Sequence, residues 1–196
     1  HHDARRQRQM CIRDRTNGVH HVYWMSGPNK ELFDVNFKDW RSDPEQLFNI
    51  DKIPNPVLRA THRQSKKRLL AYANSQLSKA LDINTLTIGF ARRAATYKRA
   101  QLIFKDVDRL IDIGKGKIQI IFSGKAHPKD EGGKSLIKNI VKSSKYFTGH
   151  IKIIYLENYN MWLGRLITSG VDVWLNTPLR PNEASGTCLL YTSDAA

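Results

Sequence analysis

The chain has 196 residues, of which 40% are hydrophobic, and it carries a formal net charge of +14. This length is enough for one α/β domain with a buried sheet, or for part of a larger protein. No apolar run approaches the roughly 20 residues that cross a bilayer, and the first residues contain no secretory apolar segment. Secretion and membrane insertion are therefore not expected, and we expect a cytoplasmic location.

The strong positive charge raises the question of a nucleic-acid partner. The lysines and arginines are spread along the chain, with groups in 63–68, 115–117 and 134–145. No aromatic stripe of an RNA-binding domain, zinc-finger spacing or Arg/Gly repeat accompanies them. We interpret them as solvated surface charges and do not expect nucleic acid to bind. A basic phosphate-binding or nucleic-acid-binding module is the non-enzyme alternative.

The two ends of the chain, residues 1–15 and 188–196, resemble translated sequencing-adapter read-through. They contain both cysteines, Cys11 and Cys188, and neither end continues a neighbouring hydrophobic pattern. We predict that both ends are non-native and take no part in the fold, the alternative being a genuine basic arm and tail. Without these cysteines no disulfide framework and no Cys-based metal site remains, and we predict no metal site.

Residues 16–55 are predicted to form an interdomain or irregular segment. Its part from 25 to 54 is rich in Asp, Asn, Pro and Lys without a sustained period, so only one short helix near 33–40 is expected. Asn55 can then cap a helix that has proline at its first position and runs to about Leu77. The residues expected to be buried in this helix are Val57, Leu69, Leu70 and Ala73.

From residue 86 onward, short apolar runs rich in β-branched and aromatic residues alternate with amphipathic stretches. The predicted strands are 86–90, 118–122, 151–156 and 171–175. The predicted helices are 97–113, one through Leu136 and Ile140 that ends near Gly149, and 161–169 stopped by Gly170. This order predicts a Rossmann-like α/β domain over 56–187, with a parallel sheet flanked by helices. The loops after the strands then share one edge of the sheet, where open α/β folds bind ligands.

Three cations, Arg92, Arg93 and Lys98, follow the first predicted strand. At the start of a helix the dipole disfavours cations, so their accumulation there indicates an anion, most naturally phosphate. The alternative is that some of these basic side chains point outward and only solubilise the helix, and it applies above all to Lys98 and to the neighbouring Arg99.

A small-residue loop, 176–187, follows the last predicted strand. Its glycine and serine allow backbone N–H groups to approach a ligand closely, and Glu183 can accept hydrogen bonds from sugar hydroxyls. This loop indicates an oxygen-rich ligand.

Several motifs, in this order, resemble those of the α-glucan phosphorylases, the glycogen and starch phosphorylase family. They are Ala-Arg-Arg-Ala-Ala-Thr-Tyr-Lys-Arg at 91–99, Leu-Glu-Asn-Tyr at 156–159 and Glu-Ala-Ser-Gly-Thr at 183–187. The first is similar to the version in the short-chain subfamily. Together with Thr-Asn-Gly-Val-His at 16–20, the resemblance covers residues 16–187 and implies part of a GT-B glycosyltransferase fold, namely its C-terminal Rossmann-like domain.

The resemblance assigns roles to individual residues. Arg93 would grip the substrate phosphate, Lys98 would lie near the phosphate of the cofactor pyridoxal 5′-phosphate, and both would be catalytic. Arg92 stands where longer-chain enzymes have lysine, and we assign it to the cofactor site. Tyr159 would line the cofactor pocket. The residues implied for the closing loop are Glu183, Ala184, Ser185 and Gly186 at the glucosyl unit, and Gly186 and Thr187 at phosphate.

The family reaction is the phosphorolysis of a terminal α-1,4-linked glucose by inorganic phosphate, which yields glucose 1-phosphate. The expected partners are thus an α-1,4-glucan, inorganic phosphate and glucose 1-phosphate, and a homo-oligomer is left open. The lysine that binds the family's cofactor covalently follows the closing loop and has no counterpart here, so we expect this fragment alone to be inactive. A nucleotide-sugar GT-B transferase of the glycogen-synthase type is the alternative among enzymes.

Overall fold

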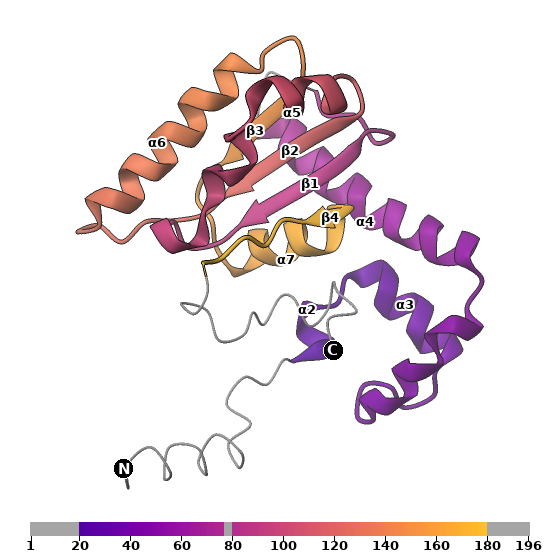
Figure 1. Cartoon of the computed structure of the whole chain (residues 1–196). Helices are drawn as coiled ribbons and strands as arrows, with labels where there is room; N and C mark the ends of the chain where they lie inside the picture. Colours follow the sequence, from indigo (N-terminus) through magenta and orange to yellow (C-terminus); the bar gives the residue numbers. More distant parts are fainter. Residues whose placement is uncertain (1–19, 77–79, 180–196) are drawn as a thin grey trace, which may run out of the picture.

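The computed structural model describes residues 20–76 and 80–179, and its centre is a parallel sheet (Figure 1). The strands are β1 Leu86–Ala91, β2 Ile118–Ser123, β3 Lys152–Leu156 and β4 Val173–Trp174. They pair in the order β3-β2-β1-β4, and every pairing is parallel. The predicted α/β class and parallel sheet are therefore confirmed. Of the fourth predicted strand, 171–175, only two residues pair in the sheet.

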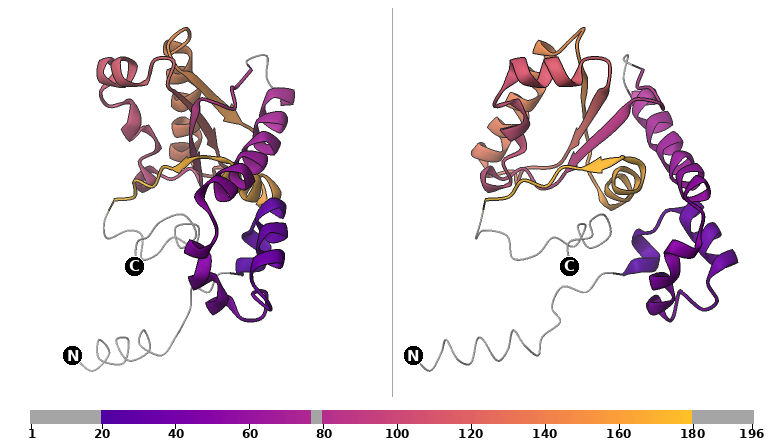
Figure 2. Two further views of the ribbon diagram at one scale, coloured as in Figure 1. Left: turned by 90° about the vertical axis from the view of Figure 1, so that its right-hand side faces the viewer. Right: turned by 45° about the vertical axis from the view of Figure 1, so that its right-hand side comes forward.

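Helices cover both faces of the sheet (Figure 2). One face packs against α5 Val107–Gly114 and α6 Glu131–Tyr146, through a buried cluster that includes Phe90, Phe122 and Phe147. The other face packs against α4 Asn55–Gln76 and α7 Met161–Gly170. Successive strand residues alternate between the two clusters because side chains in a strand point alternately to opposite faces.

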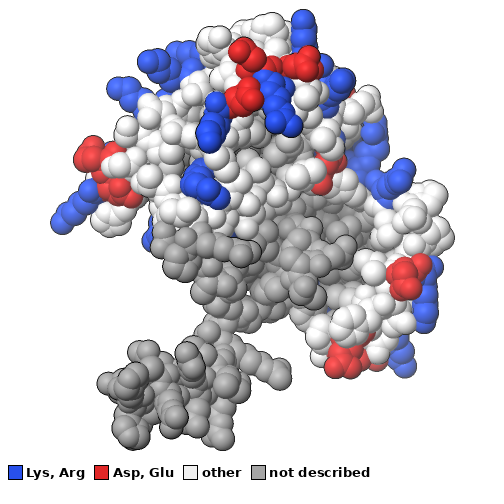
Figure 3. Space-filling model, in the orientation of Figure 1, with Lys and Arg blue, Asp and Glu red and all other residues white. Residues whose placement is uncertain are grey.

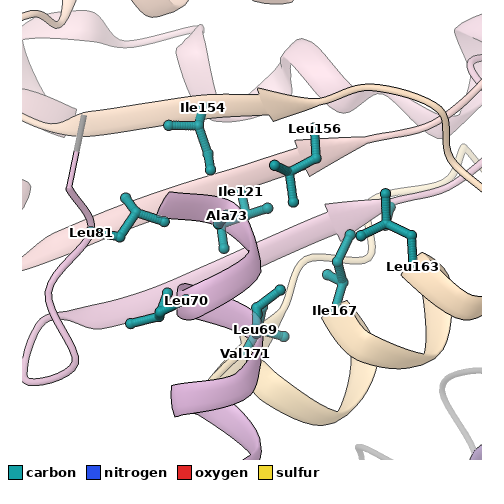
Figure 4. Close-up of a cluster of buried hydrophobic side chains, with 11 residues drawn as sticks. Leu69, Leu70, Ala73, Leu81, Ile121, Ile154, Leu156, Leu163, Ile167 and Val171 are labelled. Atoms are coloured by element: carbon teal, nitrogen blue, oxygen red, sulfur yellow. The ribbon is translucent and has the colours of Figure 1, made fainter. Parts of the chain in front are cut away.

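The α4 side of the core is shown in Figure 4. Leu69, Leu70 and Ala73 face the sheet, as predicted, and meet Ile121 and other strand residues there. The predicted burial of Val57 is wrong, because that side chain is 41% exposed. Asn55 is the first residue of the helix and not its cap, since the N–H groups of Val57 and Leu58 donate to the carbonyl of Pro54.

The segment before α4 is more regular than predicted. It contains the short helix α2 His21–Trp24, the helix α3 Gly27–Asn36 and the 3₁₀ helix η1 Pro44–Lys52. The single short helix expected near 33–40 is therefore wrong. The side-chain oxygen of Ser26 caps α3 by accepting from the N–H of Asn29 at 3.3 Å, a signal that the irregular composition concealed. These elements share a small core of their own, made of Phe33, Phe37, Trp40 and Ile53.

The single helix predicted over 97–113 is also wrong. The chain forms the 3₁₀ helices η2 Thr96–Lys98 and η3 Ala100–Phe104, and then α5. Arg99 separates the first two with a left-handed backbone (φ 49°, ψ 44°). Asp106 begins α5 as its cap, because its carboxylate accepts from the N–H of Arg109 at 3.0 Å. The helical spacing of the apolar residues did not reveal these two interruptions.

The face of the molecule drawn in Figure 3 matches the expectation of dispersed charge. On the face drawn in Figure 3, lysine and arginine side chains are scattered, with acidic residues between them. Within the described ranges, no helix combines the length and the apolar character that crossing a bilayer requires.

Candidate active site

The loops that leave the carboxyl ends of the strands are joined to one another at one edge of the sheet. After β1, the N–H of Arg92 donates to the carbonyl of Ser123 at 3.2 Å, and the N–H of Ala94 donates to that of Lys125 at 3.0 Å. The hydroxyl of Ser123 donates to the carbonyl of Leu156 at 2.8 Å, which adds the end of β3. The loops after the first three strands thus form one connected surface, as the parallel topology requires.

Gly124 permits the closest approach between the first two loops. A Cβ atom at this position would lie 2.1 Å from the carbonyl oxygen of Arg92. The carbonyl of Gly124 also accepts from the hydroxyl of Tyr155 at 2.9 Å. Burial, and then the nearby carboxylate of Glu157, raise the pKa of Tyr155 to about 12, so this phenol stays a neutral donor. The hydroxyl of Tyr155 thus holds Gly124, which lies directly against the backbone of Arg92.

Arg93, Tyr97 and Lys98 form a group just beyond the end of β1. Hydrogen bonds from Arg93 and then from Lys98 lower the pKa of the Tyr97 phenol. The Lys98 ammonium also lies 4.8 Å from the centre of the Tyr97 ring. Two of the predicted cations are thus brought to one phenol oxygen. Lys98 ends the three-residue 3₁₀ helix η2, and Arg93 lies in the loop before it. Their side chains, and not the dipole of a long helix, therefore supply the positive field.

Arg92 points toward a different partner. Its guanidinium donates to the side-chain oxygen of Asn176, which follows β4. This contact joins the end of β1 to the segment that leads into the predicted sugar-binding loop. Arg92 is half-buried, and Asn176 is too.

The segment 176–179 lies against the turn that carries the cations. The N–H of Leu179 donates to the carbonyl of Tyr97 at 2.8 Å, and the hydroxyl of Thr177 donates to the carbonyl of Lys98 at 3.0 Å. The guanidinium of Arg99 donates to the carbonyls of Thr177 and Pro178 at 2.8 and 3.2 Å. The predicted ligand residues Glu183, Ala184, Ser185, Gly186 and Thr187 lie outside the described residues.

Tyr159 lies in the loop between β3 and α7. Its hydroxyl is 3.4 Å from the carbonyl oxygen of Ala91, the last residue of β1. A Cβ atom at Gly164 would lie 2.9 Å from this hydroxyl, so the glycine makes room for the ring over the first turns of α7. Tyr159 thus packs against the neighbouring helix and also reaches the edge that carries the cations.

The structure therefore brings Arg92, Arg93, Lys98 and Tyr159 to the same edge of the sheet. Sequence reasoning did not single out three residues that complete this edge: Tyr97, Arg99 and Asn176. Tyr97 and Arg99 stand inside the Tyr-Lys-Arg motif, so the motif itself was the available signal. Asn176 had no local signal, because its partner Arg92 is 84 positions away.

Comparison with known proteins identifies the family. A carbohydrate phosphorylase family model matches residues 4–192. The maltodextrin phosphorylase of Thermococcus litoralis is 40% identical over 191 residues, which cover 88% of this chain and 23% of that protein. The glycogen phosphorylase of Aquifex aeolicus is 35% identical over 88% of this chain and 28% of that protein.

A third relative, the glycogen phosphorylase of Mycobacterium tuberculosis, is 47% identical over 114 residues, or 57% of this chain and 13% of that protein. The matched residues thus span between 13% and 28% of the length of these relatives. With the family model matching nearly all of its residues, the chain belongs to the carbohydrate phosphorylase family.

Proposed function

We propose that this chain is part of a glycogen phosphorylase-type glycosyltransferase. The enzyme would cleave the terminal α-1,4-linked glucose of a glucan with inorganic phosphate and release glucose 1-phosphate. The observation that carries the proposal is the convergence of Arg93 and Lys98 at Tyr97, beside the segment that leads to Glu183. Cations suited to a phosphate thus lie beside the segment 176–179, which leads in sequence to the predicted sugar-binding residues.

Arg93 is proposed to hold the substrate phosphate. Its planar guanidinium can donate two parallel hydrogen bonds to phosphate oxygens, whereas Lys98 offers a compact point charge. Arg93 is exposed at the edge of the sheet, so a ligand in solution can reach it. An incoming phosphate dianion would compete with the Tyr97 phenol for the guanidinium of Arg93.

The residues present also fit pyridoxal 5′-phosphate. Its phosphate is a dianion that suits Lys98 and Arg92, and its aromatic ring suits the half-buried Tyr159. When bound, the cofactor supplies a phosphate group that exchanges a proton with the substrate phosphate. Two phosphates held close together repel each other, and the positive charges of Arg92, Arg93 and Lys98 would offset that repulsion.

The proposal is tested by substitution of the two cations in the complete enzyme. Arg93→Ala should raise the KM for phosphate by about 10- to 100-fold, since a charge-assisted hydrogen bond contributes about 1.5–3 kcal/mol. Lys98→Ala should raise it less, because we place that lysine at the cofactor phosphate. Lys138→Ala, an exposed lysine of α6, serves as the control and should leave the KM unchanged.

Two outcomes would contradict the proposal. Equal phosphate dependence in the wild type and in Arg93→Ala would remove the role assigned to Arg93. Sugar transfer from a nucleotide sugar without pyridoxal phosphate would instead favour the nucleotide-sugar transferase.

A further inference from the structure

Arg99 adopts a backbone conformation that few residues with a side chain occupy. Its φ of 49° and ψ of 44° lie in the left-handed region, between η2 and η3. A non-glycine residue there costs of the order of 1 kcal/mol, and it persists when surrounding contacts determine it. The contacts that Arg99 makes therefore hold its backbone in this conformation.

Arg99 makes its contacts with the segment that follows β4. Its Nε atom donates to the carbonyl of Thr177 at 2.8 Å, and an Nη atom donates to that of Pro178 at 3.2 Å. In return, the Thr177 hydroxyl lies 3.2 Å from the carbonyl oxygen of Arg99 and 3.0 Å from that of Lys98. Arg99 is exposed, and Thr177 and Pro178 are half-buried. These hydrogen bonds, and not the burial of apolar side chains, therefore hold the two segments together at this point.

The guanidinium of Arg99 suits the two consecutive carbonyl groups to which it donates, those of Thr177 and Pro178. A guanidinium presents its N–H groups in a rigid planar fork, so one arginine can donate to both acceptors at once. A lysine ammonium would keep the charge but lose this fixed two-point geometry. Lys98, one of the proposed phosphate-binding cations, directly precedes Arg99 in the chain. We call the two hydrogen bonds from Arg99 to the carbonyls of Thr177 and Pro178 the clamp.

We propose that Arg99 is a positioning residue that fixes the segment 176–179 relative to the phosphate-binding cations. This inference rests on the proposed function. This segment leads, in sequence, to the residues that the resemblance assigns to the glucosyl unit. A shift of about 1 Å in a reacting group can cost about 100-fold in rate, so the location of this segment matters for catalysis.

The experiment measures both the position of the segment and the reaction in the complete enzyme. Hydrogen–deuterium exchange is followed in the peptide that contains Leu179, whose N–H donates to the carbonyl of Tyr97. In Arg99→Ala this peptide should exchange at least about tenfold faster, because the clamp that holds the donor is lost. The kcat for phosphorolysis should fall about tenfold or more, while the KM for phosphate stays within about twofold, since Arg93 is untouched.

Three further variants separate the effect of the Arg99 guanidinium from the effect of backbone strain and from the general effect of removing an exposed arginine. Arg99→Gly tolerates the left-handed backbone without strain, so it should behave like Arg99→Ala if the side chain is what matters. Arg99→Lys should recover part of the exchange protection but not all of kcat. Arg109→Ala, an exposed arginine of α5, should change neither quantity.

The outcomes distinguish this inference from the proposed function. Unchanged exchange in Arg99→Ala, or faster exchange with an unchanged kcat, would overturn the positioning role. Full recovery in Arg99→Gly would trace the effect to the backbone and overturn it too. If the wild type releases no glucose 1-phosphate, the proposed function fails, whereas the exchange data still decide whether the clamp exists.

Discussion

At the residue scale, single glycines decide whether the loops of the candidate site can meet. Gly124 lies against the backbone of Arg92, and no flexible side chain stands between them. Gly170 was predicted as a helix stop, and α7 does end there. The structure adds a second reason for this glycine, because a Cβ atom there would lie 2.6 Å from the Cβ atom of Leu69 in α4.

Gly124→Ala should therefore destabilise the protein. The new methyl group would lie 2.1 Å from the Arg92 carbonyl oxygen, so the backbone of one loop has to move. We expect the free energy of unfolding to fall by about 1–3 kcal/mol, as in other overpacked sites. Denaturant unfolding of the purified protein measures this change.

Gly132→Ala is the matched control for this prediction. A Cβ atom there has its nearest neighbour at 3.4 Å, which is an ordinary contact, and the residue lies in α6. Alanine in a helix should be neutral or raise stability by up to about 1 kcal/mol. A Gly124→Ala protein as stable as the control would refute the close approach of the two loops.

At the element scale, one partly buried ion pair joins α4 to the sheet at the edge opposite the candidate site. Asp172, just before β4, accepts from the ammonium of Lys66 at 2.5 Å and from the N–H of Thr87 at 2.7 Å. His62 adds a third contact at 3.0 Å. Burial alone would raise the pKa of Asp172, but these hydrogen bonds outweigh it and hold the pKa below its usual value.

Asp172→Asn should destabilise the protein at pH 7 by about 2 kcal/mol, because the buried Lys66 loses its counter-charge. A carboxyl group with a lowered folded-state pKa stabilises the fold above its unfolded-state pKa of about 4, and this contribution is lost as the pH falls through the folded value. The stability difference between the wild type and Asp172→Asn should therefore shrink as the pH falls below about 4. Urea unfolding between pH 7 and pH 3 tests this.

Glu131→Gln provides the comparison, since its pair with Lys134 on α6 is exposed. Exposed pairs contribute at most about 1 kcal/mol, so this variant should have little effect at any pH. A wild-type advantage over Asp172→Asn that stays constant down to pH 3 would exclude the ionic contribution.

At the scale of the whole molecule, the chain corresponds to about a quarter of the length of its relatives. The described residues supply one edge of a site, built from the turn at 96–99 and the segment 176–179. We propose that the remainder of the site comes from parts of the protein that this chain does not cover.

We accordingly expect the purified 196-residue chain to release no glucose 1-phosphate from a glucan in the presence of phosphate and pyridoxal phosphate. The complete enzyme should do so under the same conditions. A coupled assay for glucose 1-phosphate compares the two proteins directly. Measurable release by the isolated chain would contradict the assignment of the cofactor lysine and of the glucan-binding residues to other parts of the protein.

Much of this arrangement follows from the sequence alone. The β-branched runs and the helical spacing between them predicted the parallel α/β sheet, since both signals arise from neighbouring residues. The resemblance of 91–99 and 156–159 to phosphorylase motifs named Arg92, Arg93, Lys98 and Tyr159, and parallel topology put them at one edge.

Only the tertiary structure decided how these parts meet. The left-handed turn at Arg99 interrupts a stretch with helical spacing, and its partners in 177–178 are 78 positions or more away. The hydrogen bond between Arg92 and Asn176 and the close contact of Gly170 with α4 likewise join residues that lie far apart in the sequence. Such contacts exist only once the sheet has brought distant segments together, so no local pattern of residues encodes them.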